Sequence, residues 1–289
     1  MKNILMKNNT SSDVLSVINA GEKILENSQI QSARNEAEQI VSYFMKMTKT
    51  ALYLNMNQLI PDATQKNIDE AFRKRAKRYP LQYILQEVHF LNTILKVDES
   101  VLIARPETEF LCDFIIREYQ KKDIRQIRCL DMGTGSGAIA ISLKKELKMI
   151  SMEAVDISDR ALRTAKKNAE FNQTQIHFIQ SDLFENVQGK YDLIISNPPY
   201  VTEAEYSQLE PELFFEPKNA LVSENNGLNH IFKIIASAID YMNPNAVLYL
   251  EIGAKQAETI ISVTKNYRYR TVQIIKDLSG FDRFIRLEL

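Results

Sequence analysis

The segment IRCLDMGTGSGAIAISLKK, residues 127–145, decides the fold of this chain. A short apolar run is followed by an aspartate, by three glycines at alternate positions, and by a second apolar run with helical spacing that starts at Ala138. Glycine has no side chain, so it permits a tight turn between a strand and a helix and lets a ligand approach the backbone. The segment therefore predicts a strand, a ligand-binding loop and a helix, the unit from which parallel α/β sheets are built.

The same alternation continues toward the C-terminus, where short apolar runs alternate with amphipathic helical patterns. We expect strands over residues 127–131, 152–156, 176–180, 192–196 and 246–251, and helices over 138–148, 159–172 and about 227–241. The runs 271–275 and 284–287 are expected to close the edge of the sheet, the last of them antiparallel. The pattern thus predicts a mainly parallel sheet covered by helices on both faces.

Upstream of this region, from Ser12 to about Tyr79, apolar residues recur at three- and four-residue steps, which predicts a small helical bundle. Residues 10–13 and Ser32 are suitable N-caps for its first two helices. The basic residues between 73 and 78 are expected to be a solvated helix end, with contact to an acidic partner surface as the alternative. Two strand-like runs between residues 82 and 103 predict a β-hairpin. We therefore expect a helical bundle over 1–81, a hairpin linker over 82–104 and a larger domain over 105–289.

Composition is that of a water-soluble globular protein. The 289 residues, 45% of them hydrophobic and 25% charged, leave room for two domains and contain no apolar run long enough for a membrane span. The first ten residues lack the apolar core of a signal peptide, so we expect a cytoplasmic protein, most simply a monomer. Cys112 and Cys129 have no metal-binding spacing, and the three histidines are scattered, so we predict two buried thiols and no metal site.

Charge is distributed unevenly along the chain. Residues 1–80 carry 12 Lys and Arg against 8 Asp and Glu, and the remainder carries 24 against 29. A protein whose main partner is duplex DNA usually has a stronger basic surplus, because phosphate contacts dominate such binding. The charge balance therefore argues against a nucleic-acid substrate.

Four of the predicted strands end in a carboxylate or an amide. These residues are Asp131, Asp156, Asp182 and Asn197. Each taken alone would more often be a turn residue or a helix cap. Because ligands of open α/β sheets bind beyond the carboxyl ends of the strands, four such residues along one edge predict a binding site there.

The glycine loop is compatible with two kinds of cofactor. Its first two glycines and Ala138 also fit the G-x-G-x-x-A pattern of a nicotinamide dinucleotide site. Asp131, however, lies just before the loop, where its charge would repel a pyrophosphate and attract the ammonium and sulfonium groups of S-adenosylmethionine. We therefore predict S-adenosylmethionine as the cofactor and S-adenosylhomocysteine as its product. The loop residues expected to bind it are Gly133, Thr134, Gly135, Ser136 and Gly137.

The next two strand ends suit the nucleoside part of this cofactor. Asp156 can accept hydrogen bonds from both ribose hydroxyls. Asp182 offers a carboxylate to the exocyclic amine of adenine, and Leu183 offers an aliphatic wall to the ring. A helix cap is an equally weighted alternative for Asp182.

The tetrapeptide Asn197-Pro198-Pro199-Tyr200 follows the fourth strand and is the most specific motif of the chain. Its two prolines stiffen the loop and leave no competing N–H donors. A planar NH2 group could donate one hydrogen to the Asn197 side-chain oxygen and the other to the Pro198 carbonyl, with Tyr200 against its flat face. Two acceptors would aim the nitrogen at a methyl group without a general base. We predict that Asn197, Pro198 and Tyr200 are catalytic and that the whole tetrapeptide, including Pro199, binds the substrate. Asn197 is also predicted to contact the cofactor. The alternative is that the tetrapeptide is only a turn without a function.

The glycine loop, Asp156 and the tetrapeptide together resemble amino-group methyltransferases of the class I S-adenosylmethionine-dependent fold, which act on adenine N6 in DNA or on glutamine N5 in proteins. Further motifs resemble one branch of these enzymes, the peptide chain release factor glutamine methyltransferases. They are Pro80-Leu81-Gln82-Tyr83-Ile84, Arg105-Pro106-Glu107-Thr108-Glu109, Phe215-Glu216-Pro217, Glu251-Ile252-Gly253 and Asp277-Leu278-Ser279-Gly280-Phe281-Asp282-Arg283. The resemblance extends from about Ser12 to the end of the chain.

The resemblance implies a Rossmann-like catalytic domain preceded by a helical domain that recognises the protein partner. It also implies methylation of N5 of the glutamine in the Gly-Gly-Gln motif of class I release factors, which modulates translation termination. Two linker residues depart from the family pattern: Gln86 replaces a usual glycine and Ala104 a usual proline. The rival functions are an adenine-N6 nucleic-acid methyltransferase, for which a basic target-recognition segment is missing, and a binding module without turnover.

Overall fold

The computed structural model describes residues 12–122 and 126–289. It divides into two compact units, with the boundary between Leu85 and Gln86. This boundary falls inside the predicted linker 82–104, because residues 81–85 form a helix of the first unit while the hairpin belongs to the second. The start of the predicted first domain, including the candidate N-caps at residues 10 and 11, lies outside the described residues. Among the described residues, no helix is both long enough and apolar enough to cross a membrane.

The first unit is a bundle of short helices, as the apolar spacing predicted. Its helices are α1 (Val14–Glu26), α2 (Ala33–Met45), α3 (Lys49–Leu54), α4 (Asp62–Arg75) and α5 (Leu81–Leu85). Asp13 caps α1, because its carboxylate accepts a hydrogen bond from the backbone N–H of Ser16. Ser32 precedes α2, but its hydroxyl donates to Glu36 and does not cap a backbone N–H.

A buried ion pair joins two helices of this bundle. Arg75, at the end of α4, donates from Nε to Oε2 of Glu36 on α2 at 2.5 Å, and the two residues are only 5% and 9% exposed. The prediction of solvated charges over residues 73–78 is wrong for Arg75. Arg75 continues the buried stripe of Ile68 and Phe72 at helical spacing, so its guanidinium faces the core and requires a carboxylate partner there.

The second unit begins with the hairpin β1 (Glu87–Phe90) and β2 (Thr93–Lys96) and is built around a seven-stranded sheet. The strands of the sheet are β3 (Ile127–Met132), β4 (Ile150–Asp156), β5 (His177–Gln180), β6 (Tyr191–Ser196), β7 (Met242–Glu251), β8 (Thr271–Lys276) and β9 (Asp282–Glu288). Their order across the sheet is β5-β4-β3-β6-β7-β9-β8, and β9 is the strand antiparallel to its neighbours. The predicted α/β class with a mainly parallel sheet is thereby confirmed.

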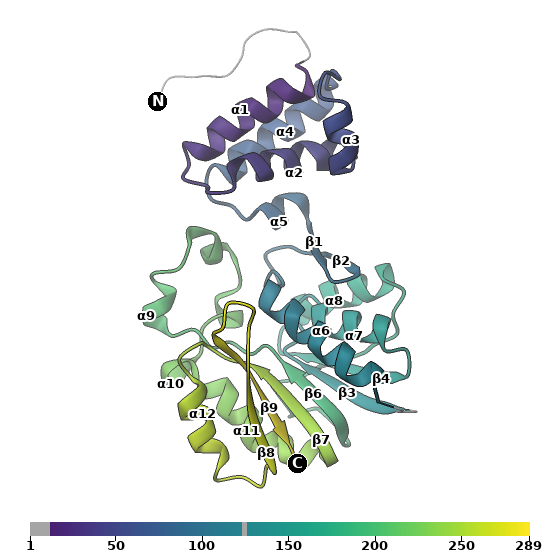
Figure 1. Cartoon of the computed structure of the whole chain (residues 1–289), viewed down its shortest axis with the longest axis vertical. Coiled ribbons are helices and arrows are strands. Elements are labelled where there is room, and N and C mark those ends of the chain that lie inside the picture. Colours follow the sequence, from purple (N-terminus) through teal and green to yellow (C-terminus); the bar gives the residue numbers. More distant parts are fainter. Residues whose placement is uncertain (1–11, 123–125) are drawn as a thin grey trace. The chain divides into compact units, whose positions relative to one another are not determined.

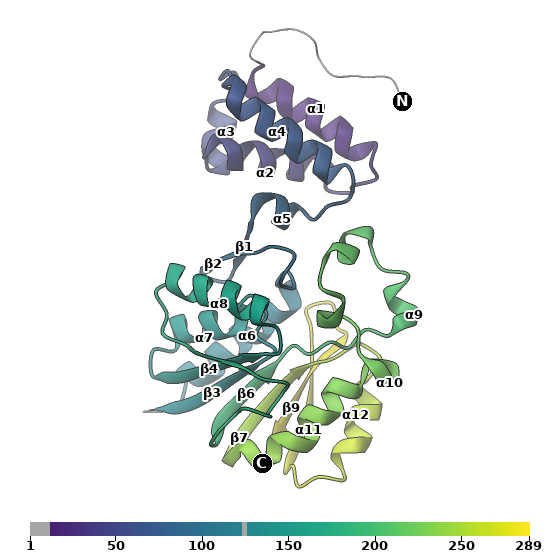
Figure 2. The ribbon, with the colours of Figure 1, turned by 180° about the vertical axis from the view of Figure 1, so that it is seen from behind.

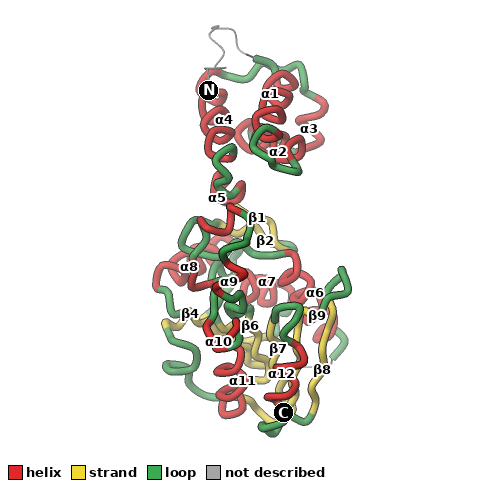
Figure 3. Tube along the Cα trace, turned by 90° about the vertical axis from the view of Figure 1, so that its left-hand side faces the viewer, coloured by secondary structure: helices red, strands yellow, loops and turns green. Residues whose placement is uncertain are grey.

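Helices cover both faces of this sheet. On one side lie α6 (Pro106–Gln120), α7 (Ala138–Glu146) and α8 (Asp159–Phe171), and on the other lie α11 (Asn229–Tyr241) and α12 (Ala257–Thr264) (Figures 1 and 2). Figure 3 shows the strands in yellow between these two sets of red helices. Successive side chains of β3 point to opposite faces of the sheet. Cys129 packs in the core under α6 and α7, and Leu130 packs in the core under α11. Cys112 and Cys129 are both buried thiols, as predicted.

The connection from β6 to α11 consists of short helical turns. They are α9 (Glu203–Tyr206), two 3₁₀ turns at Pro211–Phe215 and Lys218–Ala220, and α10 (Glu224–Gly227). Asn225 and Asn226 inside α10 have left-handed backbone conformations, so this element is a kinked turn more than a helix. Neither these turns nor α6 and α12 were predicted from the sequence.

The sheet order creates a crevice at its centre. From β3 the chain moves outward to β4 and β5 and then returns to β6 on the other side of β3. Such a reversal leaves the carboxyl ends of the two central strands open, and ligands of this class of fold bind there. Met132 of β3 pairs with Ser196 of β6 in the sheet register. The glycine loop and the tetrapeptide therefore leave the sheet side by side.

Candidate active site

The glycine loop leaves β3 with part of its backbone open to a cavity. Gly133, Gly135 and Gly137 all have positive φ, of 73°, 55° and 85°, which residues with a side chain adopt only at a cost. A Cβ added at Gly133 or Gly135 would have no atom within 4 Å, whereas one at Gly137 would lie 2.8 Å from Cδ1 of Ile141. The first two glycines therefore expose backbone to a ligand, and the third allows α7 to begin close behind the loop.

Asp131, whose charge was predicted to attract the cationic groups of the cofactor, lies behind this loop and does not line the cavity. It is on the face of β3 that packs under α7, so its side chain is fully buried. Oδ2 accepts hydrogen bonds from the Thr134 hydroxyl at 2.6 Å and from the backbone N–H of Ala140 at 3.1 Å, while Oδ1 has no partner among the described residues. Burial raises the pKa of Asp131 to about 7. The carboxyl group therefore braces the loop from inside the fold.

The second and third strand ends do line the cavity. Asp156, the last residue of β4, accepts hydrogen bonds from the backbone N–H groups of Gly135 and Ser158, both at 2.9 Å. Burial raises its pKa, and each oxygen still has a lone pair for a further donor. Asp182 is exposed, and Leu183 beside it has a φ of 47°, a strained value of the kind that recurs at binding sites.

One cavity joins these segments. Of the predicted site residues, its walls include Gly133, Gly135, Asp156, Asp182, Leu183, Asn197, Pro198 and Pro199, and they do not include Asp131, Thr134, Ser136, Gly137 or Tyr200. The combination of exposed backbone, a carboxylate and apolar side chains fits a nucleoside. A wider depression at the amino ends of β4 and β5 is lined by Lys144, Lys148 and Lys166 among others, but ligands of such sheets bind at the opposite strand ends.

The tetrapeptide is held at three points. Nδ2 of Asn197 donates to Oγ1 of Thr108 at 3.0 Å, and the Tyr200 hydroxyl donates to Oε1 of Glu251 at 3.0 Å. The Tyr200 backbone carbonyl accepts from Nε2 of Gln256, also at 3.0 Å. Burial raises the pKa of the Tyr200 phenol, so it remains a hydrogen-bond donor. With Nδ2 engaged, Asn197 keeps its side-chain oxygen as an acceptor at a position that lines the cavity.

Two walls of the cavity come from segments that the sequence analysis did not assign to the site. Residues 100–102 follow the hairpin, and part of 217–220 belongs to the turns after the tetrapeptide. Glu216, which is 5% exposed, joins these walls by accepting from the backbone N–H of Ile103 at 3.0 Å and from Nη2 of Arg105 at 2.6 Å. The sequence offered one indication of this role, because Phe215-Glu216-Pro217 is among the motifs that resemble the family and had no role assigned to it.

His230 also lines the cavity and was not predicted. Its Nδ1 lies 2.7 Å from the Ser223 hydroxyl, and burial lowers its pKa. Near neutral pH it is therefore an uncharged hydrogen-bonding group in the wall.

Two family models match the chain. The PrmC N-terminal domain matches residues 16–85, and the methyltransferase small domain matches residues 108–255. The first match lies within the helical unit, and the second contains both the glycine loop and the tetrapeptide.

Curated relatives match over most of their length. The release factor glutamine methyltransferase of Lactococcus lactis is 39% identical over 235 residues, which cover 81% of this chain and 86% of the relative. The release factor glutamine methyltransferase of Leptospira interrogans is 34% identical over 280 residues, which cover 95% of this chain and 97% of the relative. The second of these matches extends across both units.

Solved structures share the fold of the second unit. A methyltransferase from Pyrococcus furiosus superposes with a TM-score of 0.52 at 16% identity, covering 79% of this chain and 98% of that one. The 16S rRNA N2 G1207 methyltransferase of Thermus thermophilus, solved with AdoMet and guanosine, superposes with a TM-score of 0.52 at 16% identity, covering 70% of this chain and 49% of that one. At these identities the likeness concerns the fold alone.

Proposed function

The chain belongs to the release factor glutamine methyltransferase family and is an S-adenosylmethionine-dependent methyltransferase, and on that premise we propose that it methylates N5 of the glutamine in the Gly-Gly-Gln motif of class I peptide chain release factors. Methylation at that position would modulate translation termination. The observation that carries the proposal is the orientation of Asn197, whose Nδ2 is engaged by Thr108 and whose side-chain oxygen is left to accept from an amide NH2.

The cavity fits the cofactor through its own atoms. The backbone of Gly133 and Gly135 is exposed to the cavity, and the carboxylate of Asp156 lies in the cavity wall. In the proposal Asp156 accepts from the ribose hydroxyls, while Asp182 and Leu183 contact the adenine. When bound, S-adenosylmethionine supplies an electrophilic methyl group and leaves as S-adenosylhomocysteine. Thr134, Ser136 and Gly137 support this site by shaping the loop, and Asp131 does so from beneath it.

The tetrapeptide would orient the substrate amide. One N–H of the glutamine donates to Oδ1 of Asn197 and the other to the Pro198 carbonyl, while Tyr200 is held by Glu251 and limits the tilt of the amide plane. Two acceptors raise the electron density on a nitrogen that is otherwise a poor nucleophile, and they need no general base. After the transfer the methylated nitrogen loses one proton to water, which leaves a neutral N-methyl amide.

Partner recognition is assigned in this proposal to the first unit, which carries none of the residues that line the cavity. A helical unit without a cavity wall of its own can supply contact surface but no chemistry to the transfer. The substrate is then a whole folded release factor and not a free peptide, and no nucleic-acid substrate is expected.

Incubation with S-adenosylmethionine carrying a labelled methyl group tests the proposal. We expect label in a class I release factor, with mass spectrometry placing it on the Gly-Gly-Gln glutamine, and none in a release factor whose glutamine is replaced by alanine. An adenine-containing oligonucleotide serves as the parallel substrate. Label in the oligonucleotide and none in the release factor would overturn the proposal in favour of an adenine-N6 activity.

A further inference from the structure

We infer that Thr108 and Glu251 are positioning residues for the transfer: together they fix which atom of the Asn197 side chain faces the substrate, and they hold Tyr200 in place. The inference deepens the proposed function and rests on it. It concerns two residues that lie outside the tetrapeptide and do not line the cavity.

Glu251 is the last residue of β7 and is 1% exposed. Its Oε2 accepts from the Thr108 hydroxyl at 2.7 Å, and its Oε1 accepts from the Tyr200 hydroxyl at 3.0 Å. Thr108 belongs to the first turn of α6 and is 4% exposed. One buried carboxylate therefore connects α6, β7 and the tetrapeptide at the end of the sheet.

The direction of the hydrogen bonds follows from the donor count. A carboxylate only accepts, so the single hydroxyl proton of Thr108 points to Glu251. Oγ1 of Thr108 can then only accept from Asn197, at 3.0 Å, and this requires the NH2 end of the asparagine amide. The oxygen end of Asn197 is left for the cavity that the residue lines, which is the end that a substrate NH2 group needs.

The opposite orientation would defeat the proposed transfer. If Asn197 turned its NH2 end to the cavity, two donors would face each other and the glutamine amide would lose one of its two acceptors. Replacing the carboxylate of Glu251 by an amide adds a donor to the chain of bonds. In Glu251→Gln only one acceptor oxygen remains for the two hydroxyl protons, so either Thr108 or Tyr200 loses its acceptor. A Thr108 hydroxyl without that acceptor can donate to Asn197, and the orientation of the asparagine amide is then no longer fixed.

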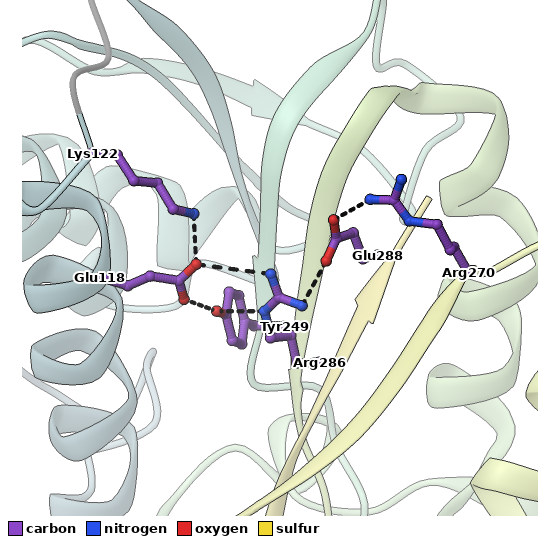
Figure 4. Close-up of polar contacts among 6 residues, drawn as sticks. All are labelled: Glu118, Lys122, Tyr249, Arg270, Arg286 and Glu288. Atoms are coloured by element: carbon purple, nitrogen blue, oxygen red, sulfur yellow. Dashed lines mark hydrogen bonds and ion pairs between the residues drawn. The ribbon is translucent and has the colours of Figure 1, made fainter.

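A second tyrosine–glutamate hydrogen bond near Glu251 supplies a control. Tyr249, two residues before Glu251 on β7, donates to Oε2 of Glu118 on α6, and Nε of Arg286 donates to the Tyr249 oxygen at 3.1 Å (Figure 4). This pair is likewise a tyrosine hydroxyl that donates to a glutamate, and it joins β7 to α6 as the Thr108–Glu251 hydrogen bond does. Glu118 differs from Glu251 in being partly exposed and paired with Lys122 and Arg286, and neither Tyr249 nor Glu118 lines the cavity. Glu118→Gln therefore reports the structural cost of such a substitution without the positioning effect.

Ionisation of Glu251 provides an independent readout. Burial and Glu107 on α6 raise its pKa to about 7, while Thr108 on α6, Tyr200 in the tetrapeptide and Arg283 on β9 oppose the rise. Protonation replaces an acceptor by a donor, so kcat should rise as pH increases through the pKa of this carboxyl. The pH profile of Glu251→Gln should lack that step.

The experiment compares Thr108→Val, Thr108→Ser, Glu251→Gln and Glu118→Gln in the full chain, with release factor as substrate. We expect kcat of Thr108→Val and Glu251→Gln to fall by about tenfold to a hundredfold, since they lose the preorganisation of a group that acts in the transition state. Calorimetric affinity for S-adenosylmethionine should stay within about threefold, because neither residue contacts the cavity. Thr108→Ser keeps the hydroxyl and should retain kcat, as should Glu118→Gln.

A double variant decides whether Thr108 acts through Asn197. If it does, adding Thr108→Val to Asn197→Ala should cause no further loss of kcat. Full activity of Thr108→Val beside an impaired Asn197→Ala would overturn the inference and leave the proposed function standing. An equal loss in Glu118→Gln, or failure of Thr108→Ser to retain activity, would also overturn it. Absence of transfer to release factor by the unmodified protein would instead refute the proposed function itself.

Discussion

Gly227 lies so close to the backbone carbonyl oxygen of Tyr200 that a Cβ on this glycine would be 2.1 Å from it. Its φ of +78° and this contact both exclude a side chain. We expect Gly227→Ala to displace the tetrapeptide and to lower kcat by about a hundredfold, the effect of a shift near 1 Å in a reacting geometry. Gly280→Ala is the matched control, because Gly280 has a φ of +83° but a Cβ added there would have no atom within 4 Å. Equal losses in both variants would mean that backbone strain, and not the contact with Tyr200, explains the effect.

Asp156→Ala should weaken binding of S-adenosylmethionine. The two ribose hydroxyls would lose a charged acceptor, and the backbone N–H of Gly135 would lose its partner at 2.9 Å. Hydrogen bonds to charged groups contribute about 1.5–3 kcal/mol each, so an increase of about a hundredfold in Kd is expected. Isothermal titration calorimetry measures it. Asp159→Ala, on the exposed first turn of α8, should leave Kd unchanged; an unchanged Kd in Asp156→Ala would remove Asp156 from the site.

Asn197→Ala should lower kcat by about a hundredfold or more, as expected for loss of one preorganised polar group, because the Pro198 carbonyl alone cannot fix the amide plane of the substrate. The affinity for S-adenosylmethionine should change much less. Steady-state kinetics with release factor, with the fold checked by circular dichroism, measures the effect. Asn243→Ala removes a comparable amide that donates to Asp192 elsewhere in the fold, and it should keep kcat. Wild-type kcat in Asn197→Ala would refute the catalytic role of the tetrapeptide.

The parallel core of the second unit was predictable because its strands and helices carry continuous local patterns. The segment 106–120 also carries one, since Leu111, Cys112 and Ile115 follow helical spacing behind Pro106 at the start of α6, but its residues were considered only as a motif. The turns between residues 203 and 227 have no periodicity to recognise. Their conformation depends on tertiary contacts such as that of Gly227 with Tyr200.

The candidate site was predictable where a residue type alone implies chemistry, as at Asn197 and Asp156. The positions of Thr108 and Glu251 could not be predicted in this way, because their hydrogen bond joins residues 143 positions apart. The position of Asp131 behind the loop could not be predicted for a different reason. The sequence shows that a carboxylate precedes the glycine loop, but the strand face on which Asp131 lies turns it toward α7 and away from the cavity.

Gly21→Ala should destabilise the first unit. A Cβ there would lie 2.1 Å from Cζ of Phe72, whose side chain is buried, so the ring would have to move. Overpacking of this kind costs about 1–3 kcal/mol, which exceeds the gain of about 1 kcal/mol from replacing a helical glycine. Denaturant unfolding followed by circular dichroism measures the loss. Phe72→Leu should make room for the new methyl group, so Gly21→Ala should cost less in that background; an undiminished cost would rule out the steric explanation.

Stability should fall as pH rises from about 5 to 8, in part through Glu251. Burial raises its pKa from 4.5 to about 7, so the folded state binds this proton more tightly than the unfolded chain. The associated stability is fully present below pH 4.5 and is lost as pH rises through 7. Asp131 contributes with the same sign for the same reason.

Comparison of the wild-type protein with Glu251→Gln isolates this contribution. His230, whose pKa is lowered by burial, contributes with the opposite sign near pH 6.5, but it is present in both proteins. Each pKa unit of difference corresponds to about 1.4 kcal/mol, so the decline in unfolding free energy between pH 5 and 8 should be about 3 kcal/mol smaller in Glu251→Gln. Urea unfolding at a series of pH values measures both curves. If the two curves run parallel across this range, Glu251 does not titrate there, because a carboxyl that ionises differently in the two states must change the slope.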